Sequence, residues 1–306
     1  MSVQFKITRR ALLAGLPAVA LAGGQNRGLQ LSNTKGEKVA FAFGNTPLFE
    51  YRYGKSLPKP YVHPLYAPNQ AVLTLDSPPD HKHHRALMIG WTEVNGYDFW
   101  GEPKSTPGPH GFTMHQKFER MREKSGELTA VNHWVAGGRI LLVERRTLRA
   151  HPPGTDTLAL DWESELKTGG SEVTLKAHKN GFDGLGIRFV HKMDGGKALN
   201  SEGTNTIEQA NGQAARWCAY CGELESGGPG GAAIFDHPSN PRHPNPFYVM
   251  KSRFGFLSVA PTFRDPFRVA ARQSLRLRYL VVTFLGEPDK AKLDSLYTAW
   301  ASERRR

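Results

Sequence analysis

The sequence predicts an all-β protein, a large antiparallel β-sandwich with a C-terminal helix, and three observations lead to this fold class. Apolar and polar residues alternate with the period of strands over many short segments. The clearest segments are residues 48–53, 128–135, 140–148, 158–166, 173–177, 187–191 and 274–284. Turn signals rich in Gly, Pro, Asn and Asp separate them at intervals of roughly 8–12 residues, as in sandwiches and barrels. One helical segment completes the pattern.

The predicted helix covers residues 288–303. Leu293, Leu296 and Trp300 share one apolar face at i, i+3, i+7 spacing, and Pro288 and Asp289 suit a first turn. We expect this helix to pack across the sandwich. Because no linker-like composition and no internal repeat interrupts the chain, residues 25–306 are predicted to form a single domain.

Residues 1–24 have the pattern of an export signal. Basic Lys6, Arg9 and Arg10 precede an apolar run that ends in small residues at 20–24. The paired arginines resemble the twin-arginine signal, and a plain secretory signal is the alternative. The apolar run is shorter than the roughly 20 residues of a membrane span, so we expect no stable membrane insertion. Both alternatives predict an exported, periplasmic protein.

The net charge of +12 favours anionic partners, but its distribution argues against nucleic acid. Without the three basic residues of segment 1–24 the charge falls to +9, and three more arginines end the chain at 304–306. The remaining basic residues are scattered rather than gathered on one face. We therefore predict no nucleic-acid partner and a small-molecule or glycan ligand, and the sequence does not indicate an oligomeric state.

Half of the histidines fall in one window, at His63, His81, His83, His84, His110 and His115. Asp80 to Arg85 form a loop between Pro78-Pro79 and a predicted strand at 86–91, and such loops commonly carry sites. If the loop is extended, His81, His83 and Arg85 point to one side and His84 to the other. His81 and His83 could then ligate a divalent metal, or act as acid and base, or belong to a solvated loop.

Two further segments carry polar residues at predicted strand ends. Asp236 and His237 follow an apolar strand and precede a proline-rich loop. Arg188 lies in the predicted strand at 187–191, where its planar fork could hold a sugar hydroxyl or a carboxylate, with a cross-strand ion pair as the alternative. Cys218 and Cys221 are three apart in a strand, so they face opposite sides and are expected to be buried, unpaired thiols.

Several of these segments resemble the bacterial PmoA-like family, also named methane oxygenase PmoA, whose activity is not established. The likeness is carried by residues 61–64, 79–91, 94–100, 183–188, 215–222 and 233–238 and by Trp300. The chain departs from the family pattern at Ala219 and Cys221, so no role transfers to those positions. The methane monooxygenase subunit of that name is an integral membrane protein, and residues 25–306 contain no run that could span a bilayer. The resemblance therefore does not imply methane oxidation.

The members of that family are often exported and often accompany sugar-degrading enzymes, which implies a carbohydrate substrate. The predicted sandwich is also similar to the supersandwich of aldose epimerases, an analogy of fold alone. No nucleophile elbow, Walker loop or dinucleotide fingerprint occurs, so no nucleotide cofactor is expected. A divalent metal remains a candidate cofactor, with His81 and His83 as its ligands.

The resulting hypothesis is an exported carbohydrate-processing enzyme, an epimerase, lyase or hydrolase. Its alternatives are a glycan-binding sandwich without catalysis and a histidine-ligated metalloenzyme or oxygenase. The candidate catalytic residues are Asp80, His81, His83 and His84. The candidate substrate-binding residues are His63, Arg85, Trp91, Tyr97, Trp100, Arg188, Asp236 and His237.

Overall fold

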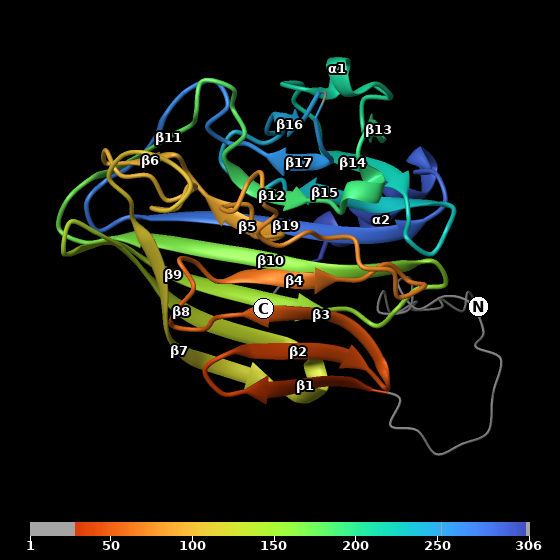
Figure 1. Cartoon of the computed structure of the whole chain (residues 1–306), viewed down its shortest axis with the longest axis horizontal. Coiled ribbons are helices and arrows are strands. Elements are labelled where there is room, and N and C mark those ends of the chain that lie inside the picture. Colours follow the sequence, from red (N-terminus) through yellow and green to blue (C-terminus); the bar gives the residue numbers. More distant parts are fainter. Residues whose placement is uncertain (1–27, 252, 304–306) are drawn as a thin grey trace, which may run out of the picture.

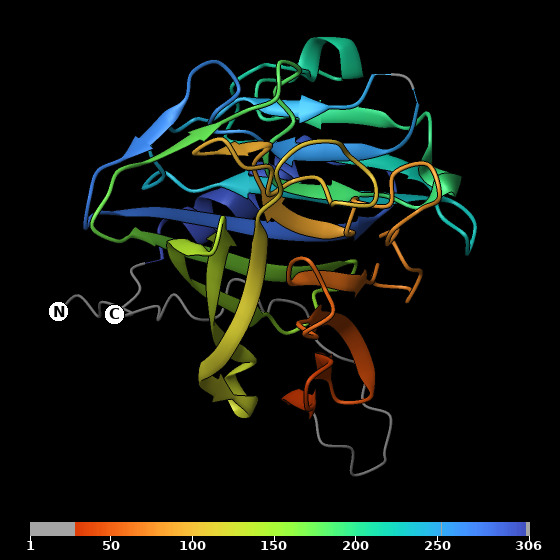
Figure 2. The same cartoon turned by 60° about the vertical axis from the view of Figure 1, so that its left-hand side comes forward.

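The computed structural model describes residues 28–251 and 253–303 and consists of two large antiparallel β-sheets stacked face to face (Figure 1). In the turned view, strands β1–β3 of one sheet face strands β7–β9 of the other across the interior (Figure 2). The contact of Tyr53 with His115 and Phe118 lies between these two edges. The predicted large antiparallel sandwich with a C-terminal helix is confirmed. The predicted export signal at 1–24 lies outside the described residues.

The first sheet has eight strands in the order β1-β2-β3-β4-β5-β12-β17-β16. Their bounds are β1 Leu29–Thr34, β2 Lys38–Phe43, β3 Thr46–Arg52, β4 Tyr61–Leu65, β5 Leu87–Gly90, β12 Gly184–Arg188, β17 Phe256–Val259 and β16 Phe247–Val249. Strand β12 lies between β5 and β17, so segments far apart in the sequence meet in the middle of this sheet.

The second sheet also has eight strands, in the order β13-β14-β15-β19-β10-β9-β8-β7. Their bounds are β13 Lys197–Asn200, β14 Trp217–Glu223, β15 Pro229–Asp236, β19 Ser274–Leu285, β10 Thr157–Thr168, β9 Arg139–Ala150, β8 Glu127–Ala136 and β7 Phe112–Arg122. A small third sheet comprises β18 Phe267–Val269, β11 Val173–Lys176 and β6 Glu93–Val94. Short 3₁₀ helices lie at Glu123–Ser125 and His191–Met193, and helix α1 is Ile207–Ala210.

Alternation of side chains explains why the long strands form. Along β9, Leu142, Glu144, Arg146 and Leu148 are buried while their neighbours are more exposed, as expected when one face of a strand meets the core. One strand differs from the sequence prediction. The strand expected at 187–191 is β12, Gly184–Arg188, and the chain then enters the 3₁₀ helix at His191–Met193.

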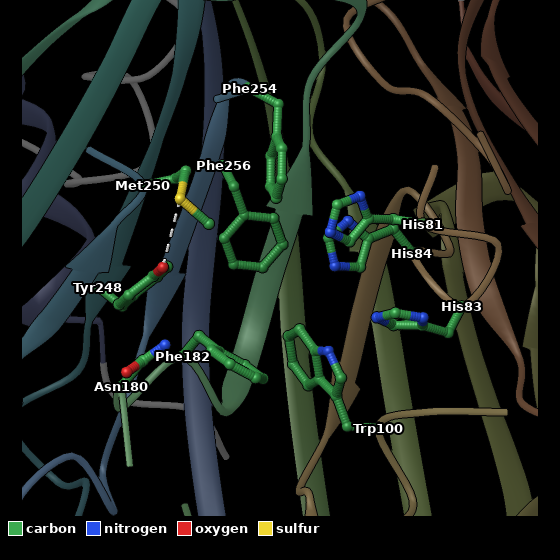
Figure 3. Close-up of a pocket in the computed structure, with 10 residues that line it drawn as sticks. All are labelled: His81, His83, His84, Trp100, Asn180, Phe182, Tyr248, Met250, Phe254 and Phe256. Atoms are coloured by element: carbon green, nitrogen blue, oxygen red, sulfur yellow. Dashed lines mark hydrogen bonds between the residues drawn. The ribbon is translucent and has the colours of Figure 1, made fainter. Parts of the chain in front are cut away.

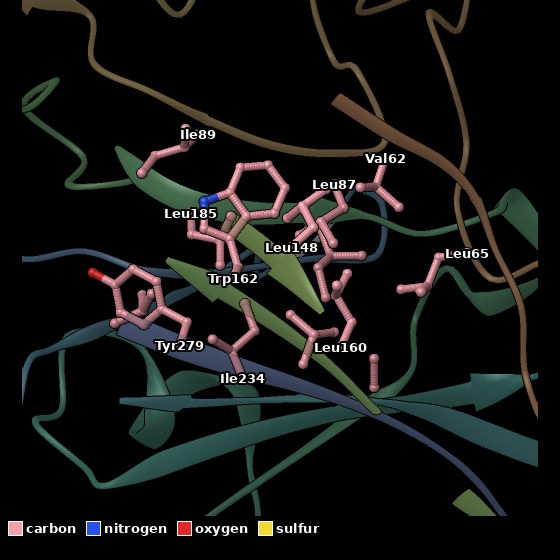
Figure 4. Packing of buried hydrophobic residues seen from close by; sticks show 14 of the residues in the cluster. Val62, Leu65, Leu87, Ile89, Leu148, Leu160, Trp162, Leu185, Ile234 and Tyr279 are labelled. Carbon is pink, nitrogen blue, oxygen red and sulfur yellow. The ribbon is translucent and has the colours of Figure 1, made fainter. Parts of the chain in front are cut away.

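The main core lies between the two sheets (Figure 4). Val62, Leu87 and Leu185 of the first sheet face the side of the second sheet that carries Leu160 and Trp162. Each of these side chains is almost inaccessible to solvent. Burying an aliphatic or aromatic side chain contributes roughly 1.5–3 kcal/mol, so this layer dominates the stability of the sandwich.

Helix α2, Lys290–Ala301, covers the outer face of the second sheet and confirms the predicted C-terminal helix. The Asp289 side chain accepts a hydrogen bond from the Lys292 backbone and so caps the helix. Leu293, Tyr297 and Trp300 are its buried residues, and they pack on β14, β15 and β19. Within the described ranges, no helix is long and apolar enough to cross a membrane.

Strand β14 also bears out the prediction for the two cysteines. Both are buried, free thiols. Cys218 belongs to the main core, whereas Cys221 belongs to the layer under α2. Residues three apart in a strand point to opposite faces, so these two sulfurs cannot pair.

The outer face of the first sheet carries a third apolar layer. It comprises Tyr61, Ala86, Met88, Trp100, Tyr248, Phe254 and Phe256, which come from β4, β5, β16, β17 and the adjoining loops. Among the described residues, no long helix covers this face as α2 covers the outer face of the second sheet. The layer instead forms one wall of the pocket described next.

Candidate functional site

A pocket of about 240 Å³ lies on the outer face of the first sheet (Figure 3). Its volume is just below the roughly 300–1,000 Å³ of typical ligand sites, which suits a small ligand. The lining combines imidazole rings on one side with aromatic and thioether side chains on the other. The lining residues are His81, His83, His84, Trp100, Asn180, Phe182, Tyr248, Met250, Phe254 and Phe256.

Tight turns, and not a strand, bring the three histidines together. The His81 backbone N–H donates to the Pro78 carbonyl, and the His84 N–H donates to the His81 carbonyl. The Ser77 N–H bonds back to His84 and closes the loop. The predicted alternation of an extended segment is therefore wrong. All three rings converge, with centroids 4.7 Å apart for His81 and His84 and 5.7 Å apart for His81 and His83.

Arg85, which was expected beside His81 and His83, turns away from them. Its Nε and Nη2 each donate to one carboxylate oxygen of Glu102 at 2.8 Å. A second carboxylate, that of Asp76, lies 3.5 Å from Nη1. Arg85 is thus fully engaged within the protein and does not line the pocket.

The opposite wall comes from segments that the sequence did not single out as site residues. Phe182 follows the turn at 179–181, and Tyr248 lies in β16. Phe256 is the first residue of β17, and Phe254 lies in the loop before it. Trp100 joins the two walls, because its ring contacts both His84 and Phe256. No short-range pattern marks these aromatics as site residues. Only the pairing of β12 with β5 and β17 brings them to the histidine loop.

Burial keeps two of the pocket imidazoles neutral. Desolvation, assisted by the positive charge of Lys59, lowers the pKa of His83 to about 4. Desolvation, assisted by the neighbouring imidazoles and Arg188, lowers the pKa of His84 to about 2. Burial also lowers the pKa of Lys59 to about 8, while its ammonium donates to the Trp100 carbonyl. Neutral imidazoles can each donate one hydrogen bond and accept another.

His81 differs from the other two because it has a carboxylate partner. Its Nδ1 lies 2.8 Å from the Asp80 Oδ2, at the edge of the pocket. A carboxylate only accepts hydrogen bonds, so Nδ1 carries the hydrogen and the neutral ring has its lone pair on Nε2. By contrast, the Nδ1 atoms of His83 and His84 are buried and have no hydrogen-bond partner within the described chain.

The other aromatic and histidine candidates lie outside the pocket. Trp91 is fully buried in the core, beside Trp134 and hydrogen-bonded to Thr262, so its faces cannot stack on a ligand. Tyr97 packs at the edge of the core, and His63 is bonded to Thr74 in the first sheet. Of the predicted aromatic platform, only Trp100 lines the pocket.

Asp236 and His237 belong to a separate polar network beside α2. The Asp236 carboxylate is buried and accepts from His243, Asn240 and Asn245. The His243 ring in turn lies 3.3 Å from the Tyr297 hydroxyl of α2. These interactions hold the loop after β15 in place, and neither Asp236 nor His237 contributes to the lining of the pocket.

Arg188 lies beside the pocket without lining it. Its guanidinium carbon is 3.9 Å from the centre of the Phe254 ring, and Phe254 contacts both His81 and His84. For metal binding, the part of the chain that the structure describes holds no group of three or more His, Cys, Asp or Glu side chains arranged as ligands. His81 and His83 are near neighbours, but in residues 28–251 and 253–303 they do not form part of a set of three ligands arranged around one position.

Comparison with known proteins gives a family but no activity. No curated protein matches the sequence. Among solved structures, the chain is similar to a TPR-domain containing protein from Parabacteroides distasonis, with 10% identity and a TM-score of 0.24 over 86% of this chain. It spans about half of that protein, 54% of its chain. Residues 38–298 match the model of a family of unknown function, DUF6807, and the chain therefore belongs to that family.

Proposed function

We propose that this chain is an exported carbohydrate-processing enzyme whose reaction takes place in the His81–His83–His84 pocket. One observation carries the proposal: three imidazole rings meet in a single pocket with aromatic walls. The His81 ring is held by Asp80, and the rings of His83 and His84 are neutral. Apolar faces with a few polar groups are typical of small-ligand sites. The C–H face of a sugar ring packs on aromatic rings such as Phe182 and Tyr248, which leaves its hydroxyls directed toward the histidines.

In this proposal, His81 is the group that moves a proton. Its Nε2 lone pair takes a proton from a sugar hydroxyl or carbon, and the resulting imidazolium is stabilised by Asp80. His83 and His84 stay neutral, so they donate and accept hydrogen bonds without competing for that proton. A proton transfer of this kind serves epimerases, lyases and hydrolases alike and needs no nucleotide cofactor.

The test is turnover of a panel of neutral and acidic mono- and oligosaccharides, with products identified by mass spectrometry. We expect His81→Gln to lower turnover by about 100-fold or more, the usual contribution of a general acid or base. Asp80→Asn should retain part of the activity, because the imidazole itself remains. His133→Gln, a half-buried histidine outside the pocket, serves as the matched control and should leave turnover unchanged.

Two other results would replace this proposal. Calorimetric sugar binding that survives His81→Gln, with no product from any substrate, would indicate a glycan-binding sandwich without catalysis. Metal analysis of protein purified without chelator addresses the divalent-metal alternative. A stoichiometric metal that is lost in His81→Gln and His83→Gln would indicate a metalloenzyme, whereas a metal-free active protein would exclude it.

A further inference from the structure

Arg188 is an unusual side chain, because its guanidinium is completely buried and poorly paired. It is 0% exposed at the end of β12, where Leu185 and Ile187 face the core and Arg188 faces the outer layer. Its Nη1 lies 3.4 Å from the Gly255 carbonyl and 3.8 Å from the Asp194 carboxylate, both long contacts. Its Nε and Nη2 are buried and have no hydrogen-bond partner among residues 28–251 and 253–303.

The two unpartnered nitrogens are the pair that binds carboxylates. Nε–H and Nη2–H project from the same edge of the planar guanidinium, and together they match the two oxygens of a carboxylate. Two other arginines of this chain use that edge in this way. Arg85 holds Glu102 with both bonds at 2.8 Å, and Arg146 holds Glu144 at 2.9 and 2.8 Å. Of these three arginines, only Arg188 has no hydrogen-bond partner at this edge among the described residues.

Leaving this edge empty costs free energy. A buried guanidinium stays charged at every pH at which the protein is folded, and an unsatisfied charged donor is strongly destabilising. The negative groups around it compensate only in part. Asp194 is 3.8 Å away, and Asp80 acts at longer range, while the Tyr220 phenol is neutral because burial raises its pKa to about 12. An anionic ligand would complete the pairing.

Phe254 lies between the Arg188 guanidinium and the pocket. Its ring lies over the Arg188 guanidinium at 3.9 Å, and the same ring lines the pocket and contacts His81 at 4.7 Å. Figure 3 shows Phe254 at the end of the pocket beside the His81 and His84 rings. A rotation of this one side chain would therefore uncover the guanidinium on the side of the pocket and the histidines.

We propose that Arg188 is the carboxylate-binding residue of this pocket and that the substrate is an acidic sugar, a uronate, whose carboxylate occupies the Nε–Nη2 edge when the Phe254 ring moves aside. The inference rests on the proposed function for the substrate being a sugar. The carboxylate would orient the ring so that the adjacent carbons face His81 and His84. The empty edge on Arg188 would be the specificity determinant between acidic and neutral sugars.

Calorimetry with galacturonate and galactose, and with glucuronate and glucose, tests the substrate class. We expect the wild-type protein to bind each uronate at least about tenfold more tightly than its neutral counterpart, the effect of a charge-assisted bidentate contact. Arg188→Gln should abolish this preference while leaving the weaker binding of the neutral sugars. Phe254→Ala should keep or strengthen uronate binding. Equal affinities of wild type and Arg188→Gln for the uronates would overturn the inference.

Benzoate separates this inference from the proposed function, because it carries a carboxylate but no sugar. We expect benzoate to bind Phe254→Ala and not the double variant Phe254→Ala/Arg188→Gln. Benzoate binding without any sugar turnover would support the Arg188 site and refute the sugar enzyme. Turnover of neutral sugars with no binding of benzoate or uronate would refute the Arg188 site alone. Should Arg188→Gln fail to fold, Arg188→Lys retains the charge without the fork and should lose the preference likewise.

Discussion

His84 is the most buried of the three pocket histidines, and its environment makes the stability of the fold depend on pH. It packs against Trp100, Phe254 and Phe256. In the folded protein its pKa is lowered to about 2, chiefly by desolvation, whereas an unfolded chain gives histidine its usual value near 6.5. Between pH 2 and pH 6.5, His84 binds a proton in the unfolded chain but not in the folded chain. Protonation of His84 in the unfolded chain therefore lowers the free energy of unfolding as the pH falls below about 6.5.

The difference in the pKa of His84 between the folded and the unfolded chain predicts a pH dependence of stability that one substitution reduces. From pH 7 to pH 5 the free energy of unfolding should fall by about 2 kcal/mol on account of His84. His84→Phe keeps an aromatic ring in the apolar layer and cannot titrate, so its urea-unfolding free energy should fall by correspondingly less over the same interval. Above pH 7.5 the two slopes should coincide, which provides the internal control. Parallel curves at all pH values would contradict the prediction.

At the scale of single residues, the sequence indicated the histidine loop but not its geometry. His81, His83, His84 and Trp100 do meet in one pocket, whereas Trp91 does not. Trp91 and Trp100 lie in the same aromatic run, and only the pairing of β5 with β12 decides which of them enters the core. The turns at 78–84 could not be read from the spacing, since they depend on backbone hydrogen bonds within the loop.

Among the elements, helix α2 shows how much a local pattern can establish. The apolar spacing placed it at 288–303, and the structure has it at Lys290–Ala301 with its cap at Asp289. Its anchoring could not be predicted, because the partner is distant in the sequence. The Trp300 indole N–H donates to the buried Asp161 carboxylate of β10 at 2.7 Å. Strand β12 lies at Gly184–Arg188 and not at the predicted residues 187–191 for a related reason. Its pairing with β5 and β17, which are distant in the sequence, fixes its bounds.

The anchoring of α2 gives a prediction at this scale. Trp300→Ala removes a fully buried ring and the donor to Asp161, so the free energy of unfolding should fall by about 3–5 kcal/mol. Thr298→Ala alters an exposed position of the same helix and should change it by less than about 0.5 kcal/mol. Urea denaturation followed by tryptophan fluorescence measures both. A loss in Trp300→Ala as small as that of the control would mean that α2 is not a stabilising layer.

For the whole molecule, the two sheets are joined by a buried charged network as well as by the apolar core. Glu144 of β9 accepts hydrogen bonds from Arg146, Trp134 and Ser164 within the second sheet. Arg146 also donates to the carbonyl of Pro60, the residue before β4 of the first sheet. Although burial alone would raise it, the pKa of Glu144 is held below its usual range by Arg146 and these donors. The ion pair is therefore charged and fully enclosed between the sheets.

Removing one partner of a buried ion pair costs far more stability than replacing both partners by uncharged residues. This difference predicts how variants at Glu144 and Arg146 unfold. Arg146→Met leaves the Glu144 charge unpaired and should lower the free energy of unfolding by about 3–5 kcal/mol. Trp134 and Ser164 donate to different oxygens of Glu144. Adding Glu144→Gln removes the charge and keeps an acceptor oxygen for one of these two donors, so the double variant should be more stable than Arg146→Met alone. Arg145→Met, on the exposed face of the same strand, should cost less than about 1 kcal/mol.

The decisive measurement is the double-mutant cycle in urea for Glu144→Gln, Arg146→Met and the double variant. A coupling energy near zero would mean that the two charges act independently. A large coupling would instead show that the two charges of β9 stabilise the sandwich as one unit.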